Sequence, residues 1–240
     1  MLELNKIYNQ DCLEGMESID GKSINLILTD LPYQVTARNT WDTIIPFDKL
    51  WASYERIIKD NGAIVLTATQ PFASKLVMSN ERLFKYEWIW EKSSGTGFLN
   101  AKKQPLRNHE QILVFYKSQP TYNPQFTEGK PYKCKSGRAS SNYNEQVSVI
   151  TENKGERYPL TVLKFIKDKE KFHPTQKPVS LGEYMVKTYT NEGDLVLDNT
   201  CGSGTFCLAA KNLNRNYIGF ENNKEYFNIA YNRLNNFVII

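Results

Sequence analysis

The stretch Asn25-Leu26-Ile27-Leu28-Thr29-Asp30-Leu31-Pro32-Tyr33 is a short apolar run that ends in a carboxylate, a proline and an aromatic ring. The run is too brief for a helix, and Pro32 would break one, so it predicts a buried strand that enters a loop. Asp30 would then stand at the carboxyl end of that strand, the edge at which open α/β sheets bind ligands. The alternative is that Asp30 only caps the next helix and Tyr33 only packs against the core.

Length and composition limit the class of protein. A chain of 240 residues can form one large α/β domain, or a domain with a small insert. Its four cysteines and two histidines lie far apart without a C-x-x-C pair, so neither a zinc site nor a disulfide framework is supported. The amino terminus lacks a signal-peptide pattern, and no apolar run approaches the roughly 20 residues that span a bilayer. We therefore expect a soluble cytoplasmic protein with no metal site and no membrane partner.

The positive charge is concentrated in one segment. The net charge of the chain is +4, but residues 118–178 hold 11 lysines and arginines against 6 aspartates and glutamates. Such an excess is typical of a surface that binds a polyanion, and also of a solvated lysine-rich surface.

Strands and helices are predicted to alternate through the first half of the chain. This alternation predicts a mostly parallel, doubly wound sheet whose last two strands form an antiparallel hairpin. Residues 35–48 are predicted to form a mobile loop, and residues 92–110, which are basic until Glu110, a flexible basic loop. Asp60-Asn61-Gly62 is a stop signal for the preceding helix. The predicted strands cover residues 6–10, 25–30, 63–68, 86–91 and 111–116, and the predicted helices residues 12–18, 47–59 and 72–80.

The second half begins with a change of character. Hydrophobic periodicity nearly vanishes over residues 118–172 until Val162–Ile166, which predicts a small inserted module or a set of long loops. The α/β pattern then resumes. Helices are predicted over residues 180–190, 206–213 and 223–237, and strands over residues 194–198 and 216–221.

Residues 195–205 read as a strand, a glycine turn and the start of a helix, where the backbone can approach a ligand closely. A phosphate-binding P-loop would need Gly-Lys-Ser/Thr, and the dinucleotide fingerprint would need a third small residue where Cys207 stands. Asp198 and Glu221 end consecutive predicted strands and suit a nucleoside that carries a cation, such as S-adenosylmethionine, better than a polyphosphate. The alternative is a tight strand-to-helix turn without a ligand.

Three motifs together resemble those of the DNA amino-methyltransferases, which methylate N6 of adenine or N4 of cytosine. Asp30-Leu31-Pro32-Tyr33 resembles the family's D-P-P-Y catalytic tetrapeptide. Asp198–Thr205 resembles its D-P-F-x-G-S-G-T cofactor loop, apart from Asn199 and Thr200. His173–Pro178 is similar to its H-x-x-x-K-P segment.

The order of these motifs resembles the circularly permuted β class of the family. The catalytic tetrapeptide comes first, then a variable basic segment, then the cofactor loop. The resemblance implies a Rossmann-like α/β fold of S-adenosylmethionine-dependent methyltransferases, with a mostly parallel seven-stranded sheet. Residues 1–117 would form the catalytic half, residues 118–172 a target-recognition insert, and residues 173–240 the cofactor-binding half.

The resemblance also implies roles for the catalytic tetrapeptide. The Asp30 carboxylate and the backbone carbonyl of residue 31 would accept hydrogen bonds from the exocyclic amine of the target base. Leu31 replaces a proline but keeps that carbonyl, with some loss of loop rigidity. Tyr33 would stack on a base rotated out of the duplex. The expected catalytic residues are Asp30, Leu31, Pro32 and Tyr33.

For the cofactor, Asp11 resembles the family's acid that reads the adenine, and Glu221 its ribose acid. Thr200 stands where an aromatic residue is expected, so any cation–π contact would come from Phe206 or Phe220. The expected S-adenosylmethionine residues are Asp11, Lys177, Asp198, Thr200, Gly202, Ser203, Gly204, Thr205 and Glu221.

Double-stranded DNA is the expected partner. Lys102, Lys103 and Arg107 are candidates for phosphate contacts, and Asn108 or Gln104 could reach base edges. The resemblance leaves open a homodimer and a companion restriction endonuclease, and it suggests a bacterial or phage-encoded protein.

The implied activity is site-specific transfer of a methyl group from S-adenosylmethionine to a base in DNA. Adenine N6 is favoured, because the family's cytosine-N4 members more often carry serine where Asp30 stands. Cytosine-C5 chemistry is disfavoured because no Pro-Cys pair occurs. The alternatives are a cytosine-N4 enzyme, a DNA-binding protein that has lost turnover, and a methyltransferase for RNA or protein amino groups, which the motif order disfavours.

Overall fold

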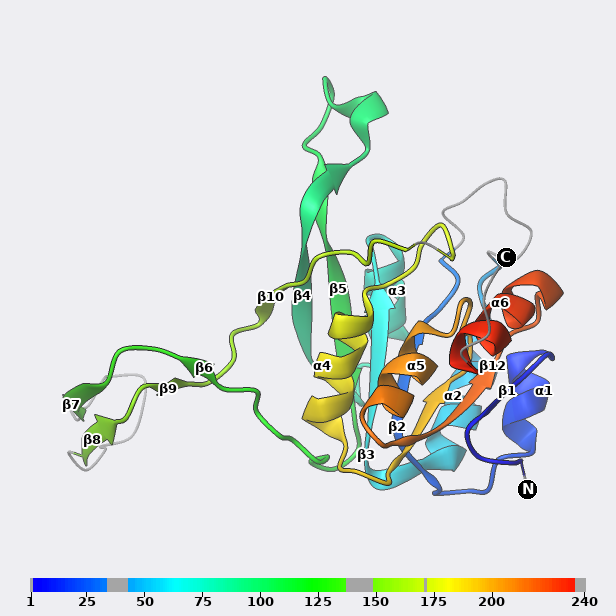
Figure 1. The fold of residues 1–240 in the computed structure, drawn as a ribbon, viewed down its shortest axis with the longest axis horizontal. Coiled ribbons are helices and arrows are strands. Elements are labelled where there is room, and N and C mark those ends of the chain that lie inside the picture. Colours follow the sequence, from blue (N-terminus) through cyan, green and yellow to red (C-terminus); the bar gives the residue numbers. More distant parts are fainter. Residues whose placement is uncertain (1, 34–42, 137–148, 171, 236–240) are drawn as a thin grey trace. The chain divides into compact units, whose positions relative to one another are not determined.

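The computed structural model describes residues 2–33, 43–136, 149–170 and 172–235. The chain divides into two compact units (Figure 1). The main unit comprises Met1–Asn123 and Thr161–Ile240, and the insert unit comprises Pro124–Leu160.

A mainly parallel sheet forms the centre of the main unit. Its strand order is β1-β12-β11-β2-β3-β5-β4-β10, and the pairings of β5 with β3 and with β4 are antiparallel. This confirms the predicted permuted α/β sheet with an antiparallel hairpin. The strands are β1 (Lys6–Tyr8), β2 (Ile24–Asp30), β3 (Ile58–Ala68), β4 (Phe84–Thr96), β5 (Arg107–Phe115), β10 (Val162–Lys164), β11 (Leu195–Asp198) and β12 (Asn216–Phe220).

Helices cover both faces of the sheet because successive side chains of a strand point to opposite faces. In β2, Ile27 packs into one core, and Leu26 and Leu28 pack into the other. All three are fully buried, and each such side chain contributes roughly 2 kcal/mol of hydrophobic stabilisation. The first core takes side chains from α1 (Cys12–Glu17), α2 (Phe47–Ile57) and α3 (Phe72–Ser79), and the second from α4 (Val179–Tyr189), α5 (Thr205–Asn212) and α6 (Lys224–Leu234).

Within the described residues the sheet has eight strands, so the predicted number of seven was wrong. The additional strand is β10, which pairs in parallel with β4 through Val162↔Ile89 and Lys164↔Glu91. The apolar run at residues 162–166 was visible in the sequence, but the edge it pairs with exists only after folding. The insert unit, Pro124–Leu160, is therefore shorter in sequence than the predicted segment of residues 118–172.

The predicted flexible loop of residues 92–110 is mostly a β-hairpin, because β4 and β5 continue to pair as far as Thr96↔Arg107. Figure 1 shows this hairpin extending past the other strands. Its tip contains a short 3-10 helix, η1 (Phe98–Asn100), which follows Gly97 in the left-handed region at φ 93°. The prediction failed because the polar hairpin stem has no apolar alternation to mark it as strand.

Asp60-Asn61-Gly62, predicted as the stop signal of the preceding helix, lies within β3. The helix ends at Ile57, and β3 begins at Ile58 with a register shift relative to β2, between the pairs Ile24↔Ile58 and Leu26↔Ala63. The polar residues that were predicted as a stop signal lie in β3 between these two pairs, where the register shifts. Of the predicted loop at residues 35–48, positions 35–42 lie outside the described residues, and Phe47 and Asp48 begin α2.

The insert unit is built from two antiparallel ribbons. One joins β6 (Thr127–Glu128) to β9 (Glu156–Arg157), and the other joins β7 (Tyr132–Ser136) to β8 (Val149–Asn153). Contacts of aromatic rings hold this unit, with Phe126 against Tyr158 at 4.8 Å between centroids and the Arg157 guanidinium 4.7 Å from the Tyr132 ring. No helix in the described parts of either unit is long and apolar enough to cross a membrane.

Candidate active site

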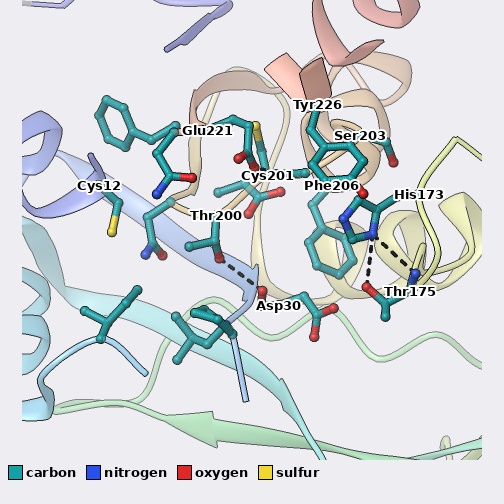
Figure 2. Close-up of a pocket in the computed structure, with 18 of the residues that line it drawn as sticks. Cys12, Asp30, His173, Thr175, Thr200, Cys201, Ser203, Phe206, Glu221 and Tyr226 are labelled. Carbon is teal, nitrogen blue, oxygen red and sulfur yellow. Dashed lines mark hydrogen bonds between the residues drawn. The ribbon is translucent and has the colours of Figure 1, made fainter. Parts of the chain in front are cut away.

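The carboxyl ends of β2 and β11 meet at one edge of the sheet. The two strands are parallel neighbours, with Leu26 paired to Val196 and Ile27 to Leu197. Their terminal acids, Asp30 and Asp198, therefore reach the same edge. A cavity of about 330 Å³ opens there, lined by the tetrapeptide of residues 30–33 and most of the glycine turn (Figure 2).

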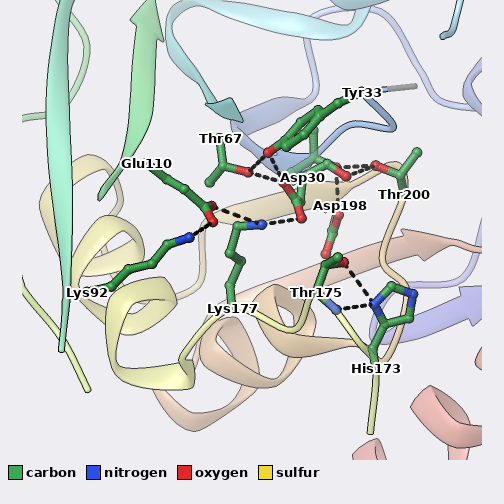
Figure 3. Close-up of polar contacts among 11 residues, drawn as sticks. Asp30, Tyr33, Thr67, Lys92, Glu110, His173, Thr175, Lys177, Asp198 and Thr200 are labelled. Carbon is green, nitrogen blue, oxygen red and sulfur yellow. Dashed lines mark hydrogen bonds and ion pairs between the residues drawn. The ribbon is translucent and has the colours of Figure 1, made fainter. Parts of the chain in front are cut away.

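The Asp30 carboxylate is held by three side chains (Figure 3). Its Oδ1 accepts hydrogen bonds from the hydroxyls of Tyr33 and Thr67, and its Oδ2 forms an ion pair with the Lys177 ammonium. Thr67 comes from β3, which pairs with β2 at this point through Asp30↔Thr67. The sequence did not single out Thr67, although it is a polar residue near the end of the apolar run of residues 63–68.

Tyr33 lies between the cavity and the core. Its ring packs against Phe72, with 5.0 Å between the ring centroids. Burial raises the pKa of the Tyr33 phenol well above its ordinary value, and the charge of Asp30 raises it further. The phenol therefore stays protonated and donates to Asp30. Leu31 and Pro32 also line the cavity, and the Leu31 side chain is buried.

Threonines tie the two strand ends together. The Thr200 hydroxyl donates to the Asp30 backbone carbonyl at 3.1 Å and lies 2.8 Å from the Thr29 hydroxyl. Thr29 in turn donates to Asp198 Oδ1 at 2.8 Å. Thr200, one of the two residues that differ from the family's cofactor-loop motif, thus links that loop to the backbone of the tetrapeptide.

The glycine turn needs two left-handed backbone conformations. Gly202 and Gly204 have φ values of 52° and 76°, which side chains other than hydrogen rarely allow. The Gly202 amide donates to Glu221 Oε2 at 2.8 Å and lines the cavity. Gly204 instead faces α6, where an added Cβ would stand 3.1 Å from the Ala230 Cβ, and it is not among the cavity-lining residues. Ser203 and Thr205 do line the cavity.

Two buried acids make the cavity suited to a cation. Burial raises the pKa of Asp198 to about 8, although the hydrogen bond from Thr29 lowers it. Burial also raises the pKa of Glu221, against the opposing effect of backbone amides that include Asn223 at 2.8 Å. A bound cation would stabilise both carboxylates in their charged forms.

The remaining expected cofactor residues also line the cavity, with added structural roles. Asp11 caps α1, its Oδ1 accepting from the amides of Leu13 at 2.8 Å and Glu14 at 3.3 Å. Lys177 is directed to Asp30 and to Glu110. Phe206 and Phe220 line the cavity as well, but both are buried in the core.

Several cavity-lining residues were not predicted as site residues, among them His173, Gln176 and Tyr226. The rings of His173 and Tyr226 meet edge to face at 4.2 Å between centroids. The motif around His173 gave a signal for the first two. Nothing in the pattern of the last helix marked Tyr226, because its neighbour comes from a segment 53 residues earlier in the chain.

The expected DNA contacts lie elsewhere. Lys102 and Lys103 stand in the tip of the β4–β5 hairpin, and Arg107 and Asn108 begin β5. All four are exposed, and none lines the cavity.

The N6/N4 DNA methylase profile matches residues 24–232. The chain belongs to this DNA methylase family. It is 30% identical over 242 residues to the type II methyltransferase M.HpaI of Haemophilus parainfluenzae, covering 95% of the chain and 74% of M.HpaI. It is also 27% identical over 250 residues to the DNA adenine methyltransferase YhdJ of Escherichia coli K12, covering 97% and 83%.

Solved structures agree with this assignment. The complex of M1.HpyAVI with S-adenosylmethionine superposes with a TM-score of 0.64 at 28% identity, covering 95% of this chain and 98% of that one. The cytosine-N4-specific PvuII DNA methyltransferase shares the fold, with a TM-score of 0.68 at 18% identity over 95% and 85% of the two chains. The chain is thus a methylase of the S-adenosylmethionine-dependent DNA methyltransferase fold, and S-adenosylmethionine is its cofactor. The glycine turn and the two buried acids fit that cation-bearing nucleoside.

Proposed function

We propose that this DNA methylase transfers the methyl group to N6 of an adenine that is rotated out of the duplex. The observation that carries the proposal is the Asp30 carboxylate, held at the cavity wall beside the glycine turn of residues 200–205. An aspartate at position 30 supports adenine over cytosine N4, for which serine is the more frequent residue at that place in the family. The relationship to an adenine methyltransferase, YhdJ, supports the same choice.

The chemistry follows from the acceptors that the tetrapeptide offers. The exocyclic amine of adenine is a weak nucleophile because its lone pair is conjugated with the ring. Hydrogen bonds from the amine to the Asp30 carboxylate and the Leu31 carbonyl would draw the nitrogen toward tetrahedral geometry and free that lone pair. The cofactor supplies a methyl group activated by a sulfonium. Methyl transfer from the sulfonium would leave one proton to be lost from the amine nitrogen, and the Asp30 carboxylate would accept that proton and pass it to solvent.

We assign the cofactor contacts to the acids that line the cavity. Asp198 would face the cationic methionine part, Glu221 the ribose hydroxyls, and Asp11 the adenine. Gly202, with its backbone amide at the cavity, allows the close approach that a bulkier residue would block.

Cofactor binding is expected to strengthen as the pH rises from 6 to 8. The pKa of Asp198 is raised to about 8, so the ligand-free protein holds a proton there at neutral pH that a bound cation must displace. Kd for S-adenosylmethionine should fall by up to about tenfold per pH unit below pH 8. Calorimetry in two buffers of different ionisation enthalpy measures the released proton, expected to be about one near pH 7.

Asp198→Asn provides the comparison for this pH dependence. The variant should bind the cofactor more weakly and release no proton, because the amide does not titrate. If the variant released as many protons as the parent protein, the pH dependence would belong to another group. Asp20→Asn, an exposed site outside the cavity, is the control that should behave like the parent.

The direct test is incubation with unmethylated genomic DNA and isotopically labelled S-adenosylmethionine, followed by mass spectrometry of the nucleosides. N6-methyladenine is the expected product. Formation of N4-methylcytosine would favour the cytosine alternative. If neither methylated base is found, the remaining alternative is a DNA-binding protein without turnover.

We further propose duplex DNA as the partner that the hairpin tip and the insert unit bind. The excess of basic residues in both segments supports this. A companion restriction endonuclease fits the relationship to type II methyltransferases such as M.HpaI. The homodimer stays a prediction.

A further inference from the structure

A series of four charged side chains runs from Asp30 into the stem of the β4–β5 hairpin (Figure 3). Asp30 pairs with Lys177, Lys177 with Glu110 at 3.3 Å between Nζ and Oε2, and Glu110 with Lys92. The side chains of Lys177, Lys92 and Glu110 are only 5%, 7% and 12% exposed. Negative and positive charges therefore alternate along a largely buried path.

The two central members of this ion series are both charged. Burial lowers the pKa of Lys177, but the carboxylates of Asp30 and Glu110 raise it more, so it lies above the ordinary value. Burial raises the pKa of Glu110, but the ammonium groups of Lys177 and Lys92 lower it below the ordinary value. Burying these ions costs desolvation free energy, whereas apolar side chains in the same positions would not incur that cost. Stability alone is therefore a poor explanation for the ion series.

The hydrogen-bond donors around Asp30 determine how many acceptor sites its carboxylate has left. An ionised carboxylate has about four acceptor sites, two on each oxygen. Oδ1 receives the hydroxyls of Tyr33 and Thr67, and Oδ2 receives Lys177. Oδ2 therefore keeps one acceptor site among the contacts of the described residues.

We propose that Lys177 is a positioning residue for the Asp30 carboxylate, holding Oδ2 so that its remaining acceptor site takes the amino group of the target base. Glu110, itself neutralised by Lys92, keeps the Lys177 ammonium aimed at Asp30. This inference rests on the proposed methyl transfer, and it differs from the role in cofactor binding that the sequence resemblance implied for Lys177.

The two residues that support Lys177 both come from the β4–β5 hairpin. Lys92 belongs to β4 and Glu110 to β5, and these strands pair through Trp90↔Glu110 and Glu91↔His109. The hairpin stem thus supports the orientation of the reacting carboxylate through Lys177, which itself lies in the predicted cofactor-binding half.

The test separates turnover from cofactor affinity. Lys177→Met is expected to lower kcat by about 10²-fold, the cost of misplacing a reacting group by about 1 Å, while Kd for S-adenosylmethionine changes by less than about threefold. Lys177→Arg, which keeps a cation, should recover most of the lost kcat. Glu110→Gln should lower kcat by about tenfold with the same unchanged Kd, because the Lys177 ammonium loses its second anchor.

Glu91→Gln is the matched control. Like Glu110, Glu91 is a carboxylate of the hairpin stem, in β4, but its partner Lys164, at 3.3 Å, is 78% exposed, and neither residue lines the cavity. This variant should keep the parent kcat. Thermal unfolding of each variant checks that it folds. If Lys177→Met does not fold, the kcat values of Lys177→Arg and Glu110→Gln decide the test.

Two results would overturn the inference. An unchanged kcat in folded Lys177→Met and Glu110→Gln would mean that the ion series does not position Asp30. A rise in Kd that accounts for the whole loss of activity would place Lys177 in the cofactor site instead. Failure of the proposed function is distinct, because the parent protein itself would then transfer no methyl group to DNA.

Discussion

Asp30→Asn is expected to lower the rate of methyl transfer by about 10³-fold or more while leaving Kd for S-adenosylmethionine within a few-fold of the parent. The amide cannot accept the proton of the amine and is a weaker acceptor than the carboxylate. Removing an electrostatic partner of a transition state costs about 10²–10³-fold, and removing a proton-transfer group costs a similar factor. The cofactor affinity should survive because Asp198, Glu221 and the glycine turn are untouched.

Single-turnover methylation and calorimetry of the cofactor measure the two quantities separately. Asp60→Asn is the control, because Asp60 is an exposed aspartate in β3, the strand beside β2, paired to Lys22 and remote from the cavity lining. It should retain the parent rate. Loss of both methylation and cofactor binding in Asp30→Asn would show that Asp30 is structural, which was the alternative interpretation of the strand end.

Replacing Lys102, Lys103 and Arg107 together by alanine is expected to weaken DNA binding by about 10²-fold at physiological salt. Each phosphate contact contributes about 0.9 to the slope of log Kd against log salt, so the slope should fall by nearly 3. The geometry supports this expectation. β5 pairs with the last residue of β3 at Ala68↔Gln111, so residues 107–110 and the hairpin tip project beyond the sheet edge that carries Asp30.

Fluorescence anisotropy with labelled duplex at several salt concentrations measures both the affinity and the slope. The matched control replaces three lysines near Asp60, namely Lys22, Lys59 and Lys117, which line a small pocket separate from the cavity. This control removes the same charge and should change the slope little. An equal loss in the two triple variants would mean that net charge, rather than the hairpin tip, determines DNA affinity.

The local features of the site were predictable from the sequence. The apolar run at residues 26–28 and the break at Pro32 placed Asp30 at a strand end, where it lies. The glycine turn of residues 200–205 likewise follows its predicted strand, with Gly202 and Gly204 in the left-handed region. These predictions succeeded because apolar runs, prolines and glycines act on backbone conformation within a few residues.

The family and the order of the motifs were also readable from the chain, since both depend on short motifs rather than on packing. The roles of single residues were less so. The sequence singled out neither Thr67, which donates to Asp30, nor Tyr226, which lines the cavity. Their importance depends on which strand or segment becomes their neighbour.

The sequence by itself determined the family, the permuted order of the sheet and the two acid-bearing strand ends of this protein. Only the tertiary structure decided that Lys92 and Glu110 lie in paired strands rather than in the predicted loop. It also decided that they form an ion pair there and that Lys177 points to Asp30. The physical reason is distance along the chain. Ion pairs between residues 30, 110 and 177 form after three remote segments have met, and their energies depend on the burial that this meeting creates.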